Sequence, residues 1–216
     1  MNISWHGLSC FEISTKGLNG EATLVIDPYQ NSTGLRFPRT LEAQVVAVTH
    51  DAEHANNIEA VLGNPFVVHN PGEYEVKGIF LYGISAPRAQ DLKGEPKANT
   101  IYRLEIEGVS LAHLGALDRE LTDEELEHLK NIDILMLPVG GGRVMSPKVA
   151  AVVMTQVEPR MVIPMTHAIE NLKEKLASVD DFCKEMGLCQ KEETTKLKIT
   201  RKDLPEEETK IVVLTR

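Results

Sequence analysis

The sequence lacks several features that mark particular classes of protein. None of its apolar runs approaches the roughly 20 residues that a membrane-spanning helix needs, and the N-terminus has no basic and then apolar signal pattern. The three cysteines are too few and too scattered for a disulfide framework or a zinc ribbon. We therefore expect a cytoplasmic protein without a membrane partner.

Positive charge is also scarce. The 216 residues include 23 lysines and arginines against 32 aspartates and glutamates, which gives a formal net charge of −9. A non-specific nucleic-acid binder needs a basic surface that displaces counterions, so we expect no nucleic-acid partner. A small anionic ligand is compatible with this charge, because one arginine in a pocket supplies positive charge locally.

The sequence does contain an ordinary share of hydrophobic residues, 42%, in regular patterns. These patterns predict strands in the first half and alternating strands and helices in the second. We expect strands within 3–15, 22–28, 43–50, 65–85, 100–115, 132–141, 160–165 and 197–216, helices at 51–63, 121–131, 146–159 and 169–187, and an exposed loop at 89–99. No linker or repeat divides the chain, so residues 1–216 are predicted to form one domain of mixed α/β class.

Two of the expected helices begin with clear capping signals. Thr122 precedes Glu125 by three residues, the spacing of a capping box. Ser146 is followed directly by Pro147, a typical pair for the cap and the first position of a helix. We expect helices to start at these two points.

Several fragments together resemble the metallo-β-lactamase fold. They follow the order of that family and cover nearly the whole chain: "ISWHGLSCFEI", "LVIDPY", "VVAVTHDAEHANNIEAV", "NPGEYEVKGIFLYGI", "NTIYRLEIEGVSLAHLGAL", "IDILMLPVGGG" and "VEPRMVIPM". The group that they resemble is the small metal-dependent hydrolases related to L-ascorbate-6-phosphate lactonase. The resemblance implies a four-layer αββα sandwich, in which two mixed β-sheets lie face to face and are flanked by helices.

The metal ligands of that family are mostly replaced in this sequence. In the family, one strand ends in Thr-His-x-His-x-Asp-His, and its histidines and aspartate hold two metals. In the segment that resembles it, His50 keeps the first ligand position, and Ala52 stands in the second. His54 replaces the aspartate, and Ala55 replaces the last histidine. The resemblance therefore implies a two-metal site that has lost most of its ligands.

The later ligand motifs of the family are altered too. In the family, "His-Leu-Gly" is followed by an aspartate that bridges the two metals, and Ala116 stands in its place here. The family's "Pro-Met-His-Tyr" supplies a histidine ligand, and Thr166 stands in that position. His167 comes one residue later than that position, and Arg88 lies near the place of a histidine expected after "GIS". A catalytic zinc needs about three protein ligands, so His50 alone does not hold one.

Two functional hypotheses remain open. In the first, the chain is a non-catalytic or weakly active relative of the hydrolases, and its pocket binds a small anion through Arg88 or Arg143. In the second, His50, His54 and His167 hold one zinc or manganese ion in a rearranged site that hydrolyses an ester, lactone or phosphoester. A one-residue shift along a strand turns a side chain to the other face, which weakens the case for His167.

The sequence leaves two further alternatives open. The ligand losses are compatible with natural divergence and with deliberate alteration of an active parent. An acidic chain with edge strands is compatible with a monomer and with a homo-oligomer.

Overall fold

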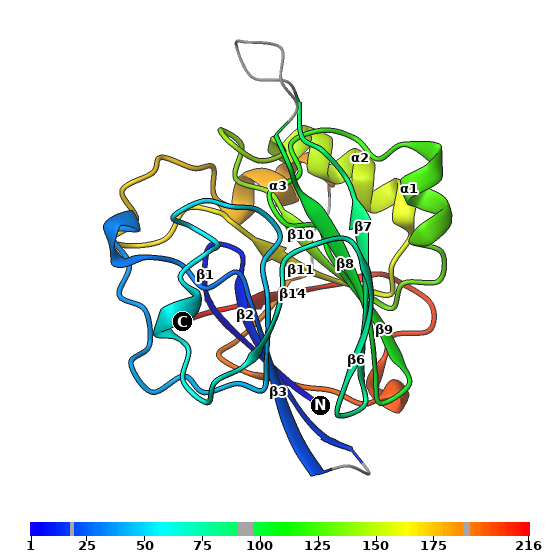
Figure 1. The fold of residues 1–216 in the computed structure, drawn as a ribbon. Coiled ribbons are helices and arrows are strands. Elements are labelled where there is room, and N and C mark those ends of the chain that lie inside the picture. Colours follow the sequence, from blue (N-terminus) through cyan, green and yellow to red (C-terminus); the bar gives the residue numbers. More distant parts are fainter. Residues whose placement is uncertain (18–19, 90–96, 188–190) are drawn as a thin grey trace.

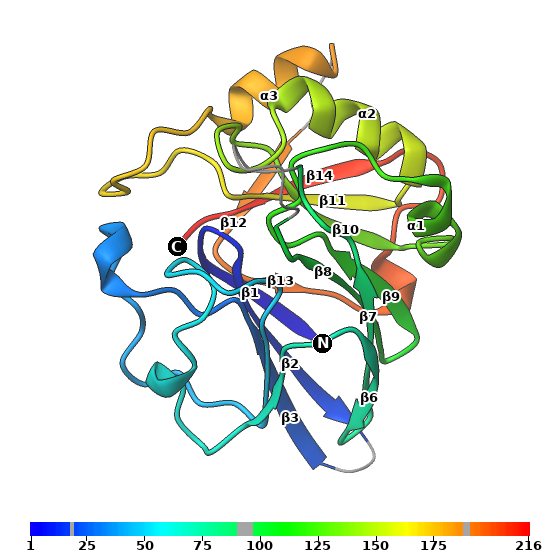
Figure 2. The same cartoon turned by 45° about the horizontal axis from the view of Figure 1, so that its top comes forward.

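A computed structural model describes residues 1–17, 20–89, 97–187 and 191–216. Two mixed β-sheets lie face to face, and helices cover the outer face of the larger one (Figures 1 and 2). The predicted metallo-β-lactamase architecture of two mixed sheets with helices is confirmed. Within the described ranges, no helix is long and apolar enough to cross a membrane.

The smaller sheet has six strands and is formed mainly by the N-terminal part of the chain. Neighbouring strands β1 to β3 run antiparallel, whereas β3, β4 and β5 run parallel. Its order is β13 (Leu197–Lys198), β1 (Asn2–Gly7), β2 (Cys10–Gly17), β3 (Gly20–Ile26), β4 (Val45–Ala47) and β5 (Phe66–Val68).

The larger sheet has eight strands, with a parallel half and an antiparallel half. Its order is β12 (Lys191–Thr194), β14 (Lys210–Leu214), β11 (Met161–Met165), β10 (Ile134–Pro138), β9 (Val109–His113), β8 (Thr100–Ile106), β7 (Ile79–Ser85) and β6 (Gly72–Val76). The helices are α1 (Asp123–His128), α2 (Pro147–Val157) and α3 (Val179–Glu185), with short 3-10 helices η1 (Asn31–Thr33), η2 (Ile58–Ala60) and η3 (Arg201–Asp203).

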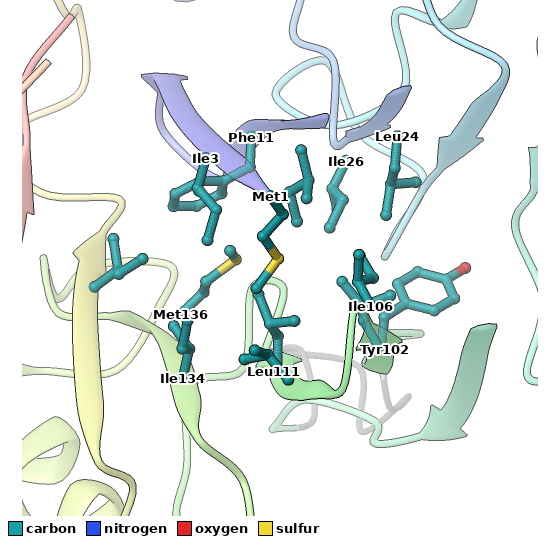
Figure 3. Close-up of a cluster of buried hydrophobic side chains, with 14 of the residues drawn as sticks. Met1, Ile3, Phe11, Leu24, Ile26, Tyr102, Ile106, Leu111, Ile134 and Met136 are labelled. Atoms are coloured by element: carbon teal, nitrogen blue, oxygen red, sulfur yellow. The ribbon is translucent and has the colours of Figure 1, made fainter. Parts of the chain in front are cut away.

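The buried residues of strand β10 show how the layers are held together. Side chains alternate along a strand, so Ile134 and Met136 pack between the two sheets, while Leu135 and Leu137 pack against the helices. Figure 3 shows Ile134 and Met136 beside Met1, which lies among the side chains between the sheets. This double burial explains why the sequence of β10 is a continuous apolar run.

Both predicted helix caps are confirmed. The Thr122 side chain accepts the backbone N–H of Glu125, whose carboxylate in turn accepts the backbone N–H of Thr122. Ser146 accepts the backbone N–H of Val149, and Pro147 is the first residue of α2.

Two of the predicted helices are wrong over most of their length. Residues 51–63 form turns and only the short helix η2, because the backbone there bonds to another loop: Gln30 donates to the Glu53 carbonyl and Asn57 to the Pro28 carbonyl. In the predicted helix 169–187, only α3 forms, and a new capping box at Ser178 starts it. Of the predicted loop 89–99, residues 90–96 lie outside the described residues.

Candidate functional site

Loops from distant parts of the chain meet around the ends of β4, β7, β10 and β11. The Thr166 N–H donates to the carbonyl of Leu8, in the turn between β1 and β2 (2.9 Å). Arg88 follows β7 and Arg143 follows β10. Nη1 of Arg88 donates to the carbonyl of Arg143 at 3.3 Å. The fold therefore brings together Arg88 and Arg143, the two residues predicted to bind a ligand.

Asp27, Thr49 and His50 form a buried chain of hydrogen bonds. The Asp27 carboxylate accepts the Thr49 N–H at 2.8 Å and the Thr49 hydroxyl at 2.7 Å, and Thr49 Oγ1 lies 2.8 Å from His50 Nδ1. Asp27 is fully buried, and this burial raises its pKa to about 7, although the bonds from Thr49 lower it. Its backbone has a φ of 49°, a strained value for a non-glycine residue.

His54 lies against His50, as their spacing of four residues allows. The two ring centroids are 4.6 Å apart. Burial, together with the charges of Arg88 and Arg143, lowers the pKa of His50 to about 2 and that of His54 to about 3, and His54 also contributes to the shift of His50. Both imidazoles are therefore neutral at pH 7, and the arginines supply the positive charge of the site.

Arg143 is held by one side of its guanidinium only. Its Nε donates to the Glu174 carboxylate at 2.8 Å, whereas Nη1 and Nη2 are buried and have no hydrogen-bond partner among the described residues. Arg88 Nε is likewise buried without a partner in the described part of the chain. Buried donors without a protein partner are uncommon, so these nitrogens are available to a bound ligand or water.

Thr166 and His167 follow β11 directly. Thr166 is fully buried with a φ of 50°, so the strand ends there and the chain turns before His167. The His167 ring stacks on Trp5 with centroids 4.8 Å apart, and its Nδ1 lies 3.2 Å from the Ala168 carbonyl. Within the described ranges, Thr166 Oγ1 and His167 Nε2 are buried and unpartnered.

Two cavities open beside the histidines. One, of about 340 Å³, has both basic and acidic residues in its lining, among them His54, Arg143, Lys173, Glu53 and Glu174. The other, of about 530 Å³, is lined by His50 and Thr49 together with apolar residues such as Val67. A small molecule therefore has room next to the unpartnered donors.

The two-metal chemistry implied by the resemblance does not fit these residues. Across the described residues, no group of three or more His, Cys, Asp or Glu side chains is placed to hold a metal ion. His50 and His54 are brought together, but His167 forms no such group with them. Two guanidinium groups close to His50 also repel a divalent cation.

Comparison with known proteins identifies the family. A family model described as a beta-lactamase superfamily domain matches residues 2–166. The chain belongs to the metallo-β-lactamase superfamily. A structure from Thermotoga maritima, named as a Zn-dependent hydrolase of this superfamily, is 30% identical, with a TM-score of 0.78. The match covers 99% of this chain and 97% of the other.

Curated relatives of this superfamily member carry hydrolase names as well. A UPF0173 metal-dependent hydrolase of Thermococcus onnurineus is 27% identical over 195 residues, which cover 76% of this chain and 84% of the relative. A UPF0173 metal-dependent hydrolase of Methanopyrus kandleri, MK1542, is 24% identical, covering 76% and 83%. This superfamily member is thus part of a family of metal-dependent hydrolases.

Sequence reasoning missed three residues of the site. Asp27 follows β3 directly and Thr49 comes two residues after β4, and a polar residue at the end of an apolar run is the signal that could have found them. Glu174 had no such signal. It reaches Arg143 only because residues 169–178 fold back over the site instead of forming a helix.

Proposed function

We propose that this member of a metal-dependent hydrolase family has a degraded two-metal site and binds a small anion through Arg88 and Arg143. It is non-catalytic or only weakly active as a hydrolase. One observation carries the proposal. The two terminal nitrogens of the Arg143 guanidinium are buried beside an open cavity and lack partners in the described structure. An anion satisfies these donors, whereas a metal cation does not.

The charges near the Arg143 guanidinium also favour an anion. Arg88 and Arg143 lie within electrostatic reach of each other, so their like charges raise the cost of leaving the pocket empty. Glu174 and Asp27 offset part of the charge of Arg143, and Asp118 offsets part of the charge of Arg88. A bound anion would relieve the repulsion between the two guanidinium groups.

The test combines metal analysis with anion binding. Protein purified without chelators should contain well under one zinc, manganese or iron per chain by mass spectrometry. In calorimetry, the wild type should bind at least one simple anion, among phosphate, sulfate and acetate, and Arg143→Met should not. One metal per chain that is lost in His50→Ala, together with no anion binding, would refute the proposal.

A second candidate is hydrolysis by one zinc or manganese ion in a rearranged site. The observation in its favour is the unpartnered, buried Nε2 atoms of His50, His54 and His167 within the described residues, since neutral imidazole nitrogens are common metal ligands. This candidate predicts stoichiometric metal and ester, lactone or phosphoester hydrolysis. Both should be lost in His50→Ala and His54→Ala.

A further inference from the structure

Basic and acidic side chains line the 340 Å³ cavity together. Among the described residues, Arg143 and Lys173 supply two positive charges to its lining, and Glu53 and Glu174 supply two negative ones. These four formal charges cancel. The lining as a whole therefore gives no advantage to a ligand with two negative charges, although Arg143 attracts a single anionic group.

The charged side chains differ in how fully they are already paired. Glu174 accepts from Arg143 Nε at 2.8 Å, so these two groups offset each other, yet both terminal nitrogens of Arg143 keep no partner in the described part of the chain. Glu53 is exposed and accepts the Ser32 hydroxyl through Oε2. Its Oε1 forms no hydrogen bond within the described ranges. The cavity thus offers one pair of buried donors and one free carboxylate oxygen.

A simple anion satisfies only half of this arrangement. It is attracted to the guanidinium of Arg143, but the carboxylate of Glu53 on the same cavity repels it. A ligand that also carries an ammonium group keeps the first interaction and turns the second into an attraction. The two terminal nitrogens of a guanidinium match the two oxygens of a planar carboxylate, so a carboxylate suits the anionic end.

We propose that the ligand is a small amino acid, whose carboxylate accepts from the terminal nitrogens of Arg143 and whose ammonium group lies against Glu53. This inference rests on the proposed function, because it names the anionic group and adds a second charge to the ligand. Leu8 and Leu172 line the same cavity and give apolar surface to the methylene groups between the two charges. The exposed Lys173 adds to the attraction of the carboxylate.

The experiment is calorimetry on the full chain at pH 7 and low, constant ionic strength, with three matched pairs of ligands. The pairs are glycine with acetate, 3-aminopropionate with propionate, and 4-aminobutyrate with butyrate. Within a pair, the ligands share the carboxylate and the chain length and differ only in the ammonium group. Wild type should bind at least one amino acid about threefold or more tightly than its matching carboxylate. Arg143→Met should bind none of the six.

Glu53→Gln tests the ammonium end of the site. The amide keeps the shape of the side chain and an oxygen for the Ser32 hydroxyl, but it has no charge. This variant should weaken binding of the preferred amino acid by about two- to fivefold and should not weaken binding of the matching carboxylate. A merely structural defect would weaken both ligands alike.

Glu59→Gln is the matched control. Glu59 is an exposed residue of η2, six positions after Glu53, and it is not among the residues that line the cavity. The substitution removes one carboxylate from the same loop region. It should leave both affinities and the preference for the amino acid unchanged.

The outcomes separate the two proposals. Carboxylates that bind as tightly as the amino acids in all three pairs would overturn the amino acid inference and leave the anion site standing. A preference that is unchanged in Glu53→Gln, or binding of phosphate or sulfate alone, would do the same. If wild type binds none of the six ligands and neither phosphate nor sulfate, both proposals fall.

Discussion

The buried carboxyl of Asp27 should make stability fall as pH rises from 5 to 7. Its pKa is about 7 in the folded protein against an ordinary value of 3.8. Between these values the folded state keeps a proton that the unfolded state releases, so the free energy of unfolding decreases as pH rises. The slope is about 1.4 kcal/mol per pH unit well below pH 7 and lessens as the folded carboxyl ionises, so the loss from pH 5 to 7 is about 2 kcal/mol.

Asp27→Asn isolates this contribution, because asparagine has the shape of the protonated carboxyl and does not titrate in this range. Urea unfolding of wild type and variant should be measured at pH 5, 6, 7 and 8. Buried histidines such as His50 have lowered pKa values and act in the opposite direction, but they cancel in the difference between the two proteins.

The expected difference has a definite sign and shape. Relative to the variant, wild type should lose about 2 kcal/mol between pH 5 and 7 and only a few tenths of a kcal/mol more from pH 7 to 8. Asp133→Asn measures the general effect of removing one carboxylate. A difference between wild type and Asp27→Asn that stays constant from pH 5 to 8 would show that Asp27 ionises normally, and the reasoning would fail.

Three further substitutions test the packing that supports the site. Gly115→Ala should destabilise by about 3 kcal/mol in urea unfolding, because φ is +62° and the new Cβ would meet Asn99 Oδ1; an unchanged midpoint would contradict this. Leu111→Ala, fully buried between the sheets, should cost about 2–5 kcal/mol, and a loss below about 1 kcal/mol would count against that packing. Tyr102→Phe removes the hydroxyl that donates to the Val48 carbonyl at 3.0 Å, and thermal unfolding should show a loss of about 1–2 kcal/mol.

The elements with strong local signals were predicted correctly from sequence. Within the segment 100–115, where strands were predicted, the β8–β9 hairpin turns at Glu107 and Gly108, and both residues have positive φ. The capping residues Thr122 and Ser146 begin α1 and α2. In each case the deciding interactions lie within a few residues of one another, so the sequence alone contains them.

The helical spacing of 51–63 and 169–187 was misleading for a physical reason. In both segments the backbone groups have better partners elsewhere: Lys173 N–H donates to the Thr33 carbonyl, and Ala177 N–H donates to the Gly140 carbonyl. Helix propensity is a weak preference that such contacts override. Only the folded chain brings these partners close.

For the site, the sequence determined which residue types are present and which family ligands are missing. It indicated Arg88 and Arg143 as candidate ligand-binding residues, and anion binding through either of them was one of two hypotheses. Only the tertiary structure decided that these two arginines meet and that Glu174 binds Arg143 through Nε alone. It also decided that Thr49 connects His50 to Asp27. The contacts of Asp27 with Thr49, of Arg143 with Glu174 and of Arg88 with Arg143 join residues 22, 31 and 55 positions apart, so no local pattern encodes them.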